Sequence, residues 1–140
     1  MLGRVTGQGH LMSAFTVDLD NHPGELARLC QALASGGVNL LLCATTQGSS
    51  GIAAFIADDE AAAQAVDEAG IEYLLRPALT VRMANLPGAG AAAFRKLAEA
   101  DINVELLLPV RISDAEFFAV ICADDPAAAE RMLGGQVITR

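Results

Sequence analysis

Hydrophobic side chains follow two different periods along the first half of the chain. In some segments they recur at every second position, which is typical of half-buried strands, and in others at every third or fourth position, which is typical of helices. Glycine and aspartate stand between these segments, as expected at turns and helix ends. The predicted elements are a strand at 13–20, a helix at 24–35, strands at 38–45 and 52–57 around a turn at 47–51, a helix at 58–69 and a short strand at 71–75.

The first predicted helix carries Leu26, Leu29 and Leu33 on one face, and we expect all three in the core. Cysteines belong to the same apolar pattern. Their number is odd, they lie in apolar segments and they show no C-x-x-C spacing, so they are expected to be buried, reduced thiols. These residues are Cys30, Cys43 and Cys122.

The second half of the chain repeats this pattern 64 positions later. Asn21-His22-Pro23-Gly24 corresponds to Asn85-Leu86-Pro87-Gly88, and Val38-Asn39 corresponds to Ile102-Asn103. After that the correspondence shifts by two residues, and we place the two extra residues in a loop at 110–115, where insertion costs least. The second set of predicted elements is a strand at 79–84, a helix at 88–100, a hairpin of strands at 104–110 and 116–123, a helix capped by Asp125 with Pro126 in its first turn, and a strand at 136–139.

Each half therefore has the order strand, helix, strand, strand, helix, strand. This predicts an α+β protein of two ferredoxin-like units, each an antiparallel sheet with both helices on one face. The units span 13–76 and 77–140, and residues 1–12 are expected to be a leader, disordered or foreign to the natural chain. Because only residues 76–78 connect the predicted strands, the units should pack against each other, as one eight-stranded sheet or as two facing sheets. The apolar runs at 40–44 and 53–57 predict that part of the second sheet face is also covered.

Composition narrows the possible functions. Of the 140 residues 53% are hydrophobic, which predicts a folded core. The formal net charge is −8, which opposes binding to nucleic acids and to anionic membranes. No apolar run approaches the roughly 20 residues that span a bilayer, and no secretory signal is recognised. We expect a cytoplasmic protein.

The loop between the first strand and the first helix carries a resemblance. Asn21-His22-Pro23-Gly24-Glu25-Leu26, followed by Gly37-Val38-Asn39-Leu40, resembles the ACT domain, the small amino-acid-sensing module. The second copy resembles it through Asn85-Leu86-Pro87-Gly88 and Asp101-Ile102-Asn103-Val104, and departs at Gly90 and Asp101. The resemblance covers residues 13–139 and implies a tandem ACT protein that binds a small ligand near these loops, commonly between two domains.

The loop also has a physical interpretation. Proline is preorganised for the first turn of a helix, and glycine lets a ligand or another backbone approach closely. The helix that follows offers free N–H groups and the positive end of its dipole, which together suit a carboxylate. The ammonium group of an amino acid would then contact Asp18 or Asp20, or carbonyl groups of a partner. Pro-Gly is equally good turn chemistry without a ligand, and Asn39 and Asn103 are as well explained as turn caps.

We expect the ligand between the two units, where each Pro-Gly loop would approach the second strand of the other unit. The first site should bind its ligand more tightly, because the second loop has fewer polar side chains to contact a ligand. The candidate ligand-binding residues are Asn21, His22, Pro23, Gly24, Glu25, Leu26, Val38, Asn39 and Leu40 in the first copy, and Asn85, Leu86, Pro87, Gly88, Ala89, Ile102 and Asn103 in the second. No metal and no cofactor is expected, since Asp58-Asp59 and Asp124-Asp125 are interpreted as helix N-caps.

Three classes of function remain. The first is a regulatory sensor that binds a free amino acid and acts on an unidentified partner. The second is an adaptor that assembles through its sheet edges and binds no small ligand. The third, an enzyme, is disfavoured because no nucleophile motif, P-loop or dinucleotide-binding fingerprint is recognised. In the first two cases unpaired sheet edges and Ala-rich surfaces predict a homodimer.

Overall fold

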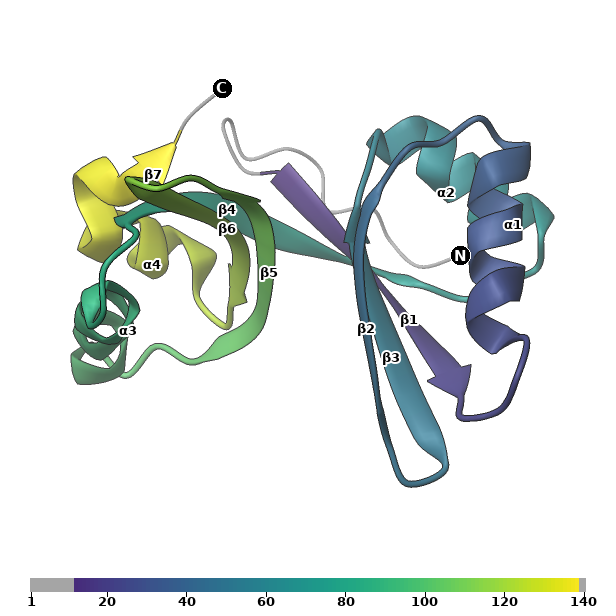
Figure 1. The fold of residues 1–140 in the computed structure, drawn as a ribbon, viewed down its shortest axis with the longest axis horizontal. Helices are drawn as coiled ribbons and strands as arrows, with labels where there is room; N and C mark the ends of the chain where they lie inside the picture. The colour runs from purple at the N-terminus through teal and green to yellow at the C-terminus, as the bar shows by residue number, and fades with distance from the viewer. Residues whose placement is uncertain (1–11, 139–140) are drawn as a thin grey trace. The chain divides into compact units, whose positions relative to one another are not determined.

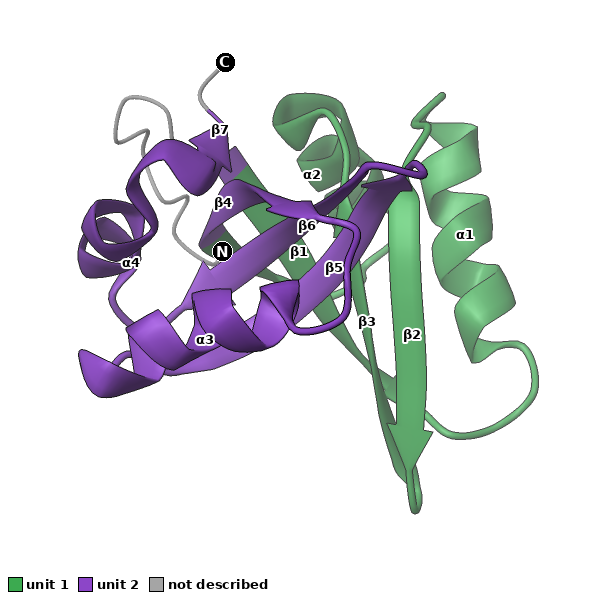
Figure 2. Cartoon of the chain, turned by 60° about the vertical axis from the view of Figure 1, so that its left-hand side comes forward, with its two compact units in different colours: residues 1–5, 13–76 green, residues 6–12, 77–140 purple. Residues whose placement is uncertain are grey.

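The structure, a computed structural model, describes residues 12–138. By their internal contacts these residues divide into two compact units, with unit 1 covering 13–76 and unit 2 covering Met12 and 77–138 (Figure 2). The predicted leader lies outside the described residues except for Met12, which begins the first strand. The expected packing of the units against each other stays a prediction.

Unit 1 has an antiparallel sheet with two helices on one face (Figure 1). Strand β3 lies between β1 and β2, and the start of β4 follows β1 in the strand order. This confirms an α+β fold with an antiparallel sheet. The elements are β1 (Met12–Asp20), α1 (Glu25–Ser35), β2 (Leu41–Gln47), β3 (Ser50–Ile56), α2 (Asp59–Glu68) and the first residues of β4 (Leu74–Ala84).

The core of unit 1 lies between the sheet and the two helices. Phe15 on β1 stacks on Phe55 of β3 with ring centroids 4.9 Å apart. The ring of Tyr73 packs at a tilt against that of Phe15, with centroids 5.4 Å apart. Leu29 and Leu33 of α1 are fully buried against them, as predicted. Leu26 is 42% exposed, so its assignment to the core was wrong. It lies in the first turn of α1, where the helix extends beyond the sheet-facing core.

Unit 2 repeats the order of elements. Strand β6 lies between β4 and β5, β7 pairs with β4, and the pairs are antiparallel. Its core includes Leu79 and Val81 of β4, Leu97 of α3, and Ile121 of β6. The remaining elements are α3 (Ala89–Glu99), β5 (Val104–Ile112), β6 (Glu116–Ala123), α4 (Pro126–Leu133), a 3-10 turn η1 (Gly134–Gln136) and β7 (Val137–Ile138).

Strand β4 corrects one prediction. The sequence predicted two strands separated by residues 76–78, whereas the structure has one strand, Leu74–Ala84, of which 74–76 belong to unit 1 and 77–84 to unit 2. Pro77 interrupts the hydrophobic alternation and suggested a break. Its fixed φ is nevertheless compatible with extended backbone, and it is tolerated wherever its missing N–H is not needed by a neighbouring strand.

The two extra residues of unit 2 lie in a strand, and only one of them falls within the predicted range 110–115. The β2–β3 pairing runs without a shift from Leu41↔Ile56 to Gln47↔Ser50. The β5–β6 pairing instead shifts twice, between Val104 and Leu106 and between Pro109 and Arg111. Each shift adds one residue to β5, as a β-bulge does. The extra residues are therefore within the strand and not in the loop, and the second of them, Val110, is the first residue of the predicted range.

The expected covering of the second sheet face stays a prediction, whereas the burial of two cysteines differs from the prediction. Cys122 is buried, but Cys30 and Cys43 are exposed, contrary to prediction. Their apolar neighbours suggested burial, but Cys30 lies on the outer side of α1 and Cys43 on the outermost strand, β2. In the described part of the chain, no helix is both long and apolar enough to cross a membrane.

Candidate functional site

The loop between β1 and α1 is tied to the hairpin turn between β2 and β3. Asn21 Nδ2 donates a hydrogen bond to the Gly48 carbonyl at 2.8 Å, and the Asn21 backbone N–H donates to the Ser49 carbonyl at 3.0 Å. Unit 2 has the same arrangement, with Asn85 Nδ2 donating to the Ser113 carbonyl at 2.7 Å. The repeated asparagine therefore holds two neighbouring loops together. This supports the structural interpretation of Asn21 and Asn85.

The repeated glycine is required by its backbone conformation. Gly24 has φ +97° and Gly88 has φ +90°, in the left-handed region that other residues adopt only with strain. An added Cβ would meet no atom within 4 Å at either position. Close packing therefore does not explain these glycines, while the positive φ does. The sequence argument had considered only the space that glycine leaves.

Helix α1 begins at this loop without a side-chain cap. Gly24 is its N-cap residue and supplies no side-chain hydrogen bond, and Gly88 leaves α3 uncapped in the same way. The second helix of each unit differs, because Asp58 accepts from Ala61 N at 2.9 Å and Asp125 accepts from Ala128 N at 3.0 Å. Those two N-caps were predicted correctly. Asp124 instead accepts from Asn103 N at 3.0 Å, so its interpretation as a cap was wrong.

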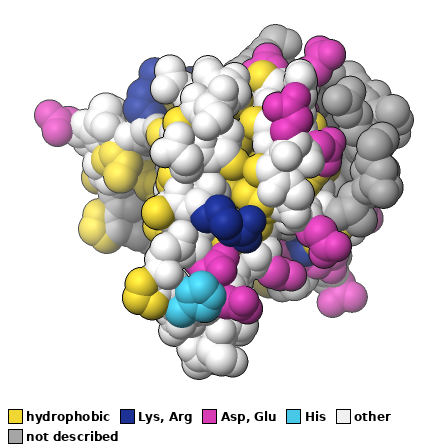
Figure 3. All heavy atoms as spheres, turned by 90° about the vertical axis from the view of Figure 1, so that its right-hand side faces the viewer, with side chains coloured by type: hydrophobic (Ala, Val, Ile, Leu, Met, Phe, Trp, Pro, Cys, Tyr) yellow, Lys and Arg dark blue, Asp and Glu magenta, His cyan; other side chains and the backbone are white. Residues whose placement is uncertain are grey.

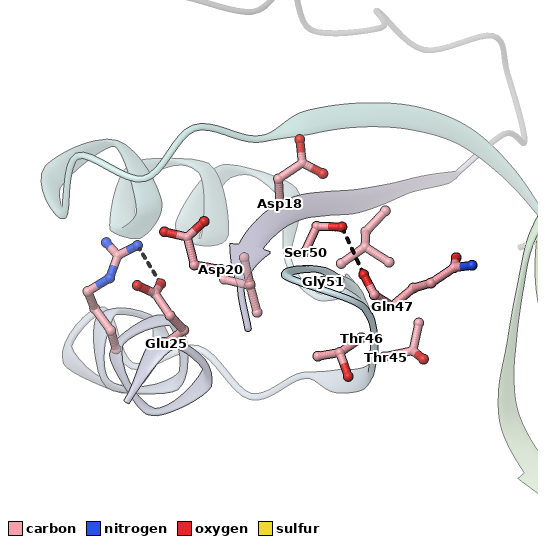
Figure 4. A pocket seen from close by; sticks show the side chains of 11 residues that line it. Asp18, Asp20, Glu25, Thr45, Thr46, Gln47, Ser50 and Gly51 are labelled. Atoms are coloured by element: carbon pink, nitrogen blue, oxygen red, sulfur yellow. Dashed lines mark hydrogen bonds and ion pairs between the residues drawn. The ribbon is translucent and has the colours of Figure 1, made fainter. Parts of the chain in front are cut away.

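A cavity of about 710 Å³ opens at this end of unit 1 (Figure 4). Asp20 and Glu25 lie on one side of it, and the hairpin residues Thr45 and Gln47 lie on the other. Arg28 Nη2 pairs with Glu25 Oε2 at 3.3 Å. The cavity thus combines carboxylates, one guanidinium and several neutral hydrogen-bonding groups. Its lining residues are Asp18, Leu19, Asp20, Glu25, Arg28, Thr45, Thr46, Gln47, Ser50, Gly51 and Ile52.

A smaller cavity lies against the loop in each unit, and its chemistry differs between the two. In unit 1 it measures about 290 Å³ and is lined partly by Asp20, His22 and Glu25. In unit 2 it measures about 280 Å³, and the residues that line it include Leu86 and Phe94. The two loops therefore share a backbone but offer different surfaces, one charged and one largely apolar. This difference agrees with the lower polar capacity expected of the second copy.

Three potential metal ligands gather at the unit 1 loop. His22 Nε2 lies 3.1 Å from Glu25 Oε1, and ligand atoms of Asp20, His22 and Glu25 all lie within 4.8 Å of one another. The His22 side chain is 58% exposed and that of Glu25 only 17%. Figure 3 shows a histidine among acidic side chains on this face of the molecule.

The structure brings together only part of the predicted site within each unit. Residues 21–26 lie at the start of α1, whereas Val38 follows its end, and its backbone N–H donates to the Leu33 carbonyl. The 11 residues of α1 separate these two groups by about 16 Å. Ile102 closes α3 in the same way, by donating to the Leu97 carbonyl. The expectation that the ligand lies between the two units stays a prediction.

Sequence reasoning missed most of the cavity wall. Arg28 carried a usable signal, because it stands three residues after Glu25 and helical residues so spaced are neighbours. The hairpin residues Thr45, Thr46 and Gln47 carried none, since they were treated only as a strand end and a turn. Their place beside the loop follows from the β1–β3–β2 strand order.

The chain shares its fold with several solved structures, two of which are regulatory subunits. A protein of Bacteroides thetaiotaomicron designated BT0572 superposes with a TM-score of 0.83 at 19% identity, covering 95% of each chain. The regulatory subunit of aspartate kinase from Thermus thermophilus gives 0.64 at 23%, covering 89% of this chain and 91% of that one. The corresponding subunit from Thermus flavus gives 0.58 at 24%, covering 88% and 91%.

At these identities the comparison establishes the fold alone. No protein-family model and no curated protein sequence matches the chain. The chain thus has an α+β fold that also occurs in regulatory subunits of aspartate kinase.

Proposed function

We propose that this protein is a non-catalytic regulator of two ACT-like, ferredoxin-type units that binds a free amino acid in the cavity of unit 1. One observation carries the proposal. The uncapped start of α1 lies beside a cavity of about 710 Å³ that is lined by carboxylates and by Arg28. Small-ligand sites are commonly concave and hold a few polar groups that fix the ligand's orientation. The fold shared with regulatory subunits favours a sensor over an enzyme.

The two charged ends of an amino acid have different partners in this cavity. Its carboxylate fits near Arg28 and the free N–H groups in the first turn of α1, where the helix dipole favours negative charge. Its ammonium group fits near Asp18 and Asp20, as the sequence suggested. Thr45 and Gln47 offer neutral hydrogen-bonding groups for the side chain of the ligand. On the helix side the wall is formed by Glu25 and Arg28.

The experiment is a thermal-shift screen of free amino acids, with a chelator present throughout. A ligand at 100 times its Kd should stabilise the protein by about 2.7 kcal/mol. For a ligand found in this way, Asp18→Asn and Arg28→Gln should each weaken binding at least tenfold in calorimetry. Asp67→Asn is the matched control, because it removes the same charge from the exposed side of α2. Failure of every amino acid to shift the transition would overturn the proposal.

The adaptor function is the second candidate, and one observation favours it. Strand β2 is outermost in the unit 1 sheet, and Leu41 on it is 45% exposed. Such an edge has backbone groups that can pair with another chain, including a second copy in a homodimer. An adaptor predicts assembly in light scattering that no amino acid changes. A sensor predicts an amino-acid-dependent thermal shift in the same preparation.

A further inference from the structure

The internal repeat separates what the Pro-Gly loop needs for folding from what it does not need. Asn21 and Asn85 make the same type of side-chain bond to the adjacent hairpin turn. Gly24 and Gly88 have nearly the same positive φ. The loop therefore adopts one conformation in both units. Any side chain that differs between the copies is not required for that conformation.

The positions that differ between the two loops include those of all three potential metal ligands. Unit 1 has Asp20, His22 and Glu25, whose ligand atoms lie within 4.8 Å of one another. The corresponding residues of unit 2 are Ala84, Leu86 and Ala89, none of which has a metal-binding side chain. Because the loop of unit 2 folds without these groups, loop folding does not account for their convergence in unit 1.

The imidazole of His22 is oriented as in a metal ligand. Its Nδ1 lies 3.1 Å from the Pro23 carbonyl, which can only accept, so this contact assigns the proton to Nδ1. In the neutral ring Nε2 then presents a lone pair to Glu25 Oε1, 3.1 Å away, which also carries a lone pair. A proton on Nε2 makes this contact an ion pair, and a metal ion in place of that proton would bridge the same two atoms. Histidine ligands of metals usually donate their other N–H to a carbonyl or carboxylate in this way.

The separation of the donors suits a metal as well as a proton. Zinc takes imidazole nitrogen and carboxylate oxygen at about 2.0–2.2 Å in tetrahedral geometry, so two of its ligands lie about 3.3–3.6 Å apart. Nε2 and Oε1 are 3.1 Å apart, so they would have to separate by only a few tenths of an ångström to admit the ion. A ligand atom of Asp20 lies within 4.8 Å of both.

The surrounding charges favour a cation on balance. Asp18 lines the same cavity as Asp20 and Glu25, and adds a third negative charge. Arg28 opposes it, as does the positive end of α1. Arg28 pairs with Glu25 through Oε2, however, and this leaves Oε1 facing His22. The guanidinium thereby also fixes the orientation of the carboxylate.

We propose that Asp20, His22 and Glu25 bind one divalent metal ion of the zinc class at the mouth of the unit 1 cavity. Mixed imidazole and carboxylate ligands suit such ions better than magnesium or calcium, which prefer oxygen alone. Three protein ligands leave a coordination position open toward the cavity. The sequence predicted no metal, because its aspartate pairs were considered only as helix caps. This site does not depend on amino-acid binding, and is measured without it.

The test is calorimetric titration of the full chain with Zn²⁺ in the absence of amino acids. Wild-type protein should bind one ion in a way that requires His22. The variants Asp20→Ala, His22→Leu and Glu25→Ala should each weaken binding at least tenfold. They install the residues that the unit 2 loop already carries, so native circular dichroism is expected. Controls are Asp67→Asn, Cys30→Ser and His10→Leu, the last outside the described residues, and each should bind like wild type.

A gain-of-function variant makes the test decisive. Ala84→Asp, Leu86→His and Ala89→Glu together should add a second ion per chain. Undiminished zinc affinity in His22→Leu, or zinc binding that is lost in Cys30→Ser, would overturn the proposal. The absence of zinc binding to wild-type protein would do the same. Amino-acid binding in the presence of a chelator would still support the proposed function, so the two failures are distinguishable.

Discussion

Replacing the loop glycines by alanine should destabilise the protein although there is space for the added methyl group. Gly24 and Gly88 have φ +97° and +90°, and a Cβ at either position would contact nothing within 4 Å. The whole effect should therefore come from the backbone. A left-handed conformation costs an L-residue about 1–2 kcal/mol. Alanine restricts the unfolded chain and returns about 0.4–1 kcal/mol. The net loss should be about 1 kcal/mol for each variant.

The assay is urea unfolding followed by circular dichroism, with Gly135→Ala as the matched control. Gly135 also has open space around its Cβ position but no positive φ, so its replacement should be neutral or slightly stabilising. Gly24→Asn should fall between wild type and Gly24→Ala, because asparagine tolerates the left-handed region better than alanine. If Gly24→Ala and Gly88→Ala are as stable as Gly135→Ala, the reasoning from φ is wrong.

Four further substitutions test the fold, each by the same unfolding measurement. Asn21→Ala and Asn85→Ala should each lower the free energy of unfolding by about 1 kcal/mol, through loss of the bond to the hairpin turn, and a neutral effect would contradict this role. Phe15→Ala should cost about 3–5 kcal/mol, because it removes a fully buried ring stacked on Phe55, and a loss below 1 kcal/mol would be inconsistent with that packing. Gly36→Ala should cost about 1–3 kcal/mol, since its Cβ would lie 2.8 Å from that of Ala65, and wild-type stability would show that α1 and α2 separate easily.

The sequence predicted the order and type of the elements because the hydrophobic period changes clearly at each boundary. The prediction failed at Pro77, at the two extra residues of unit 2 and at two of the cysteines. Pro77 suggested a break in a strand that continues through it. The two extra residues of unit 2 suggested a loop, because a β-bulge leaves no sequence signal comparable to that of a turn. Cys30 and Cys43 have apolar neighbours in the sequence but occupy outward-facing positions. Which positions face outward depends on tertiary packing.

The candidate site was predicted in part. The Pro-Gly loop and the nearby acids Asp18 and Asp20 could be found, because a repeated motif stands out even in a single sequence. The positive φ of Gly24 could not, since glycine is compatible with many conformations. The convergence of His22 with Glu25 depends on side-chain orientation at the start of α1, which hydrophobic periodicity does not report.

The most direct test of the central claim is an NMR titration of the uniformly ¹⁵N-labelled protein with the free amino acids, in the presence of a chelator. Binding in the unit 1 cavity predicts that one amino acid shifts the backbone amides at 18–28 and 45–52, with much smaller shifts in Asp18→Asn protein. Asp67→Asn protein should respond as wild type does. If no amino acid shifts these amides, or if the shifts gather elsewhere and persist in Asp18→Asn protein, the proposed regulatory site is contradicted.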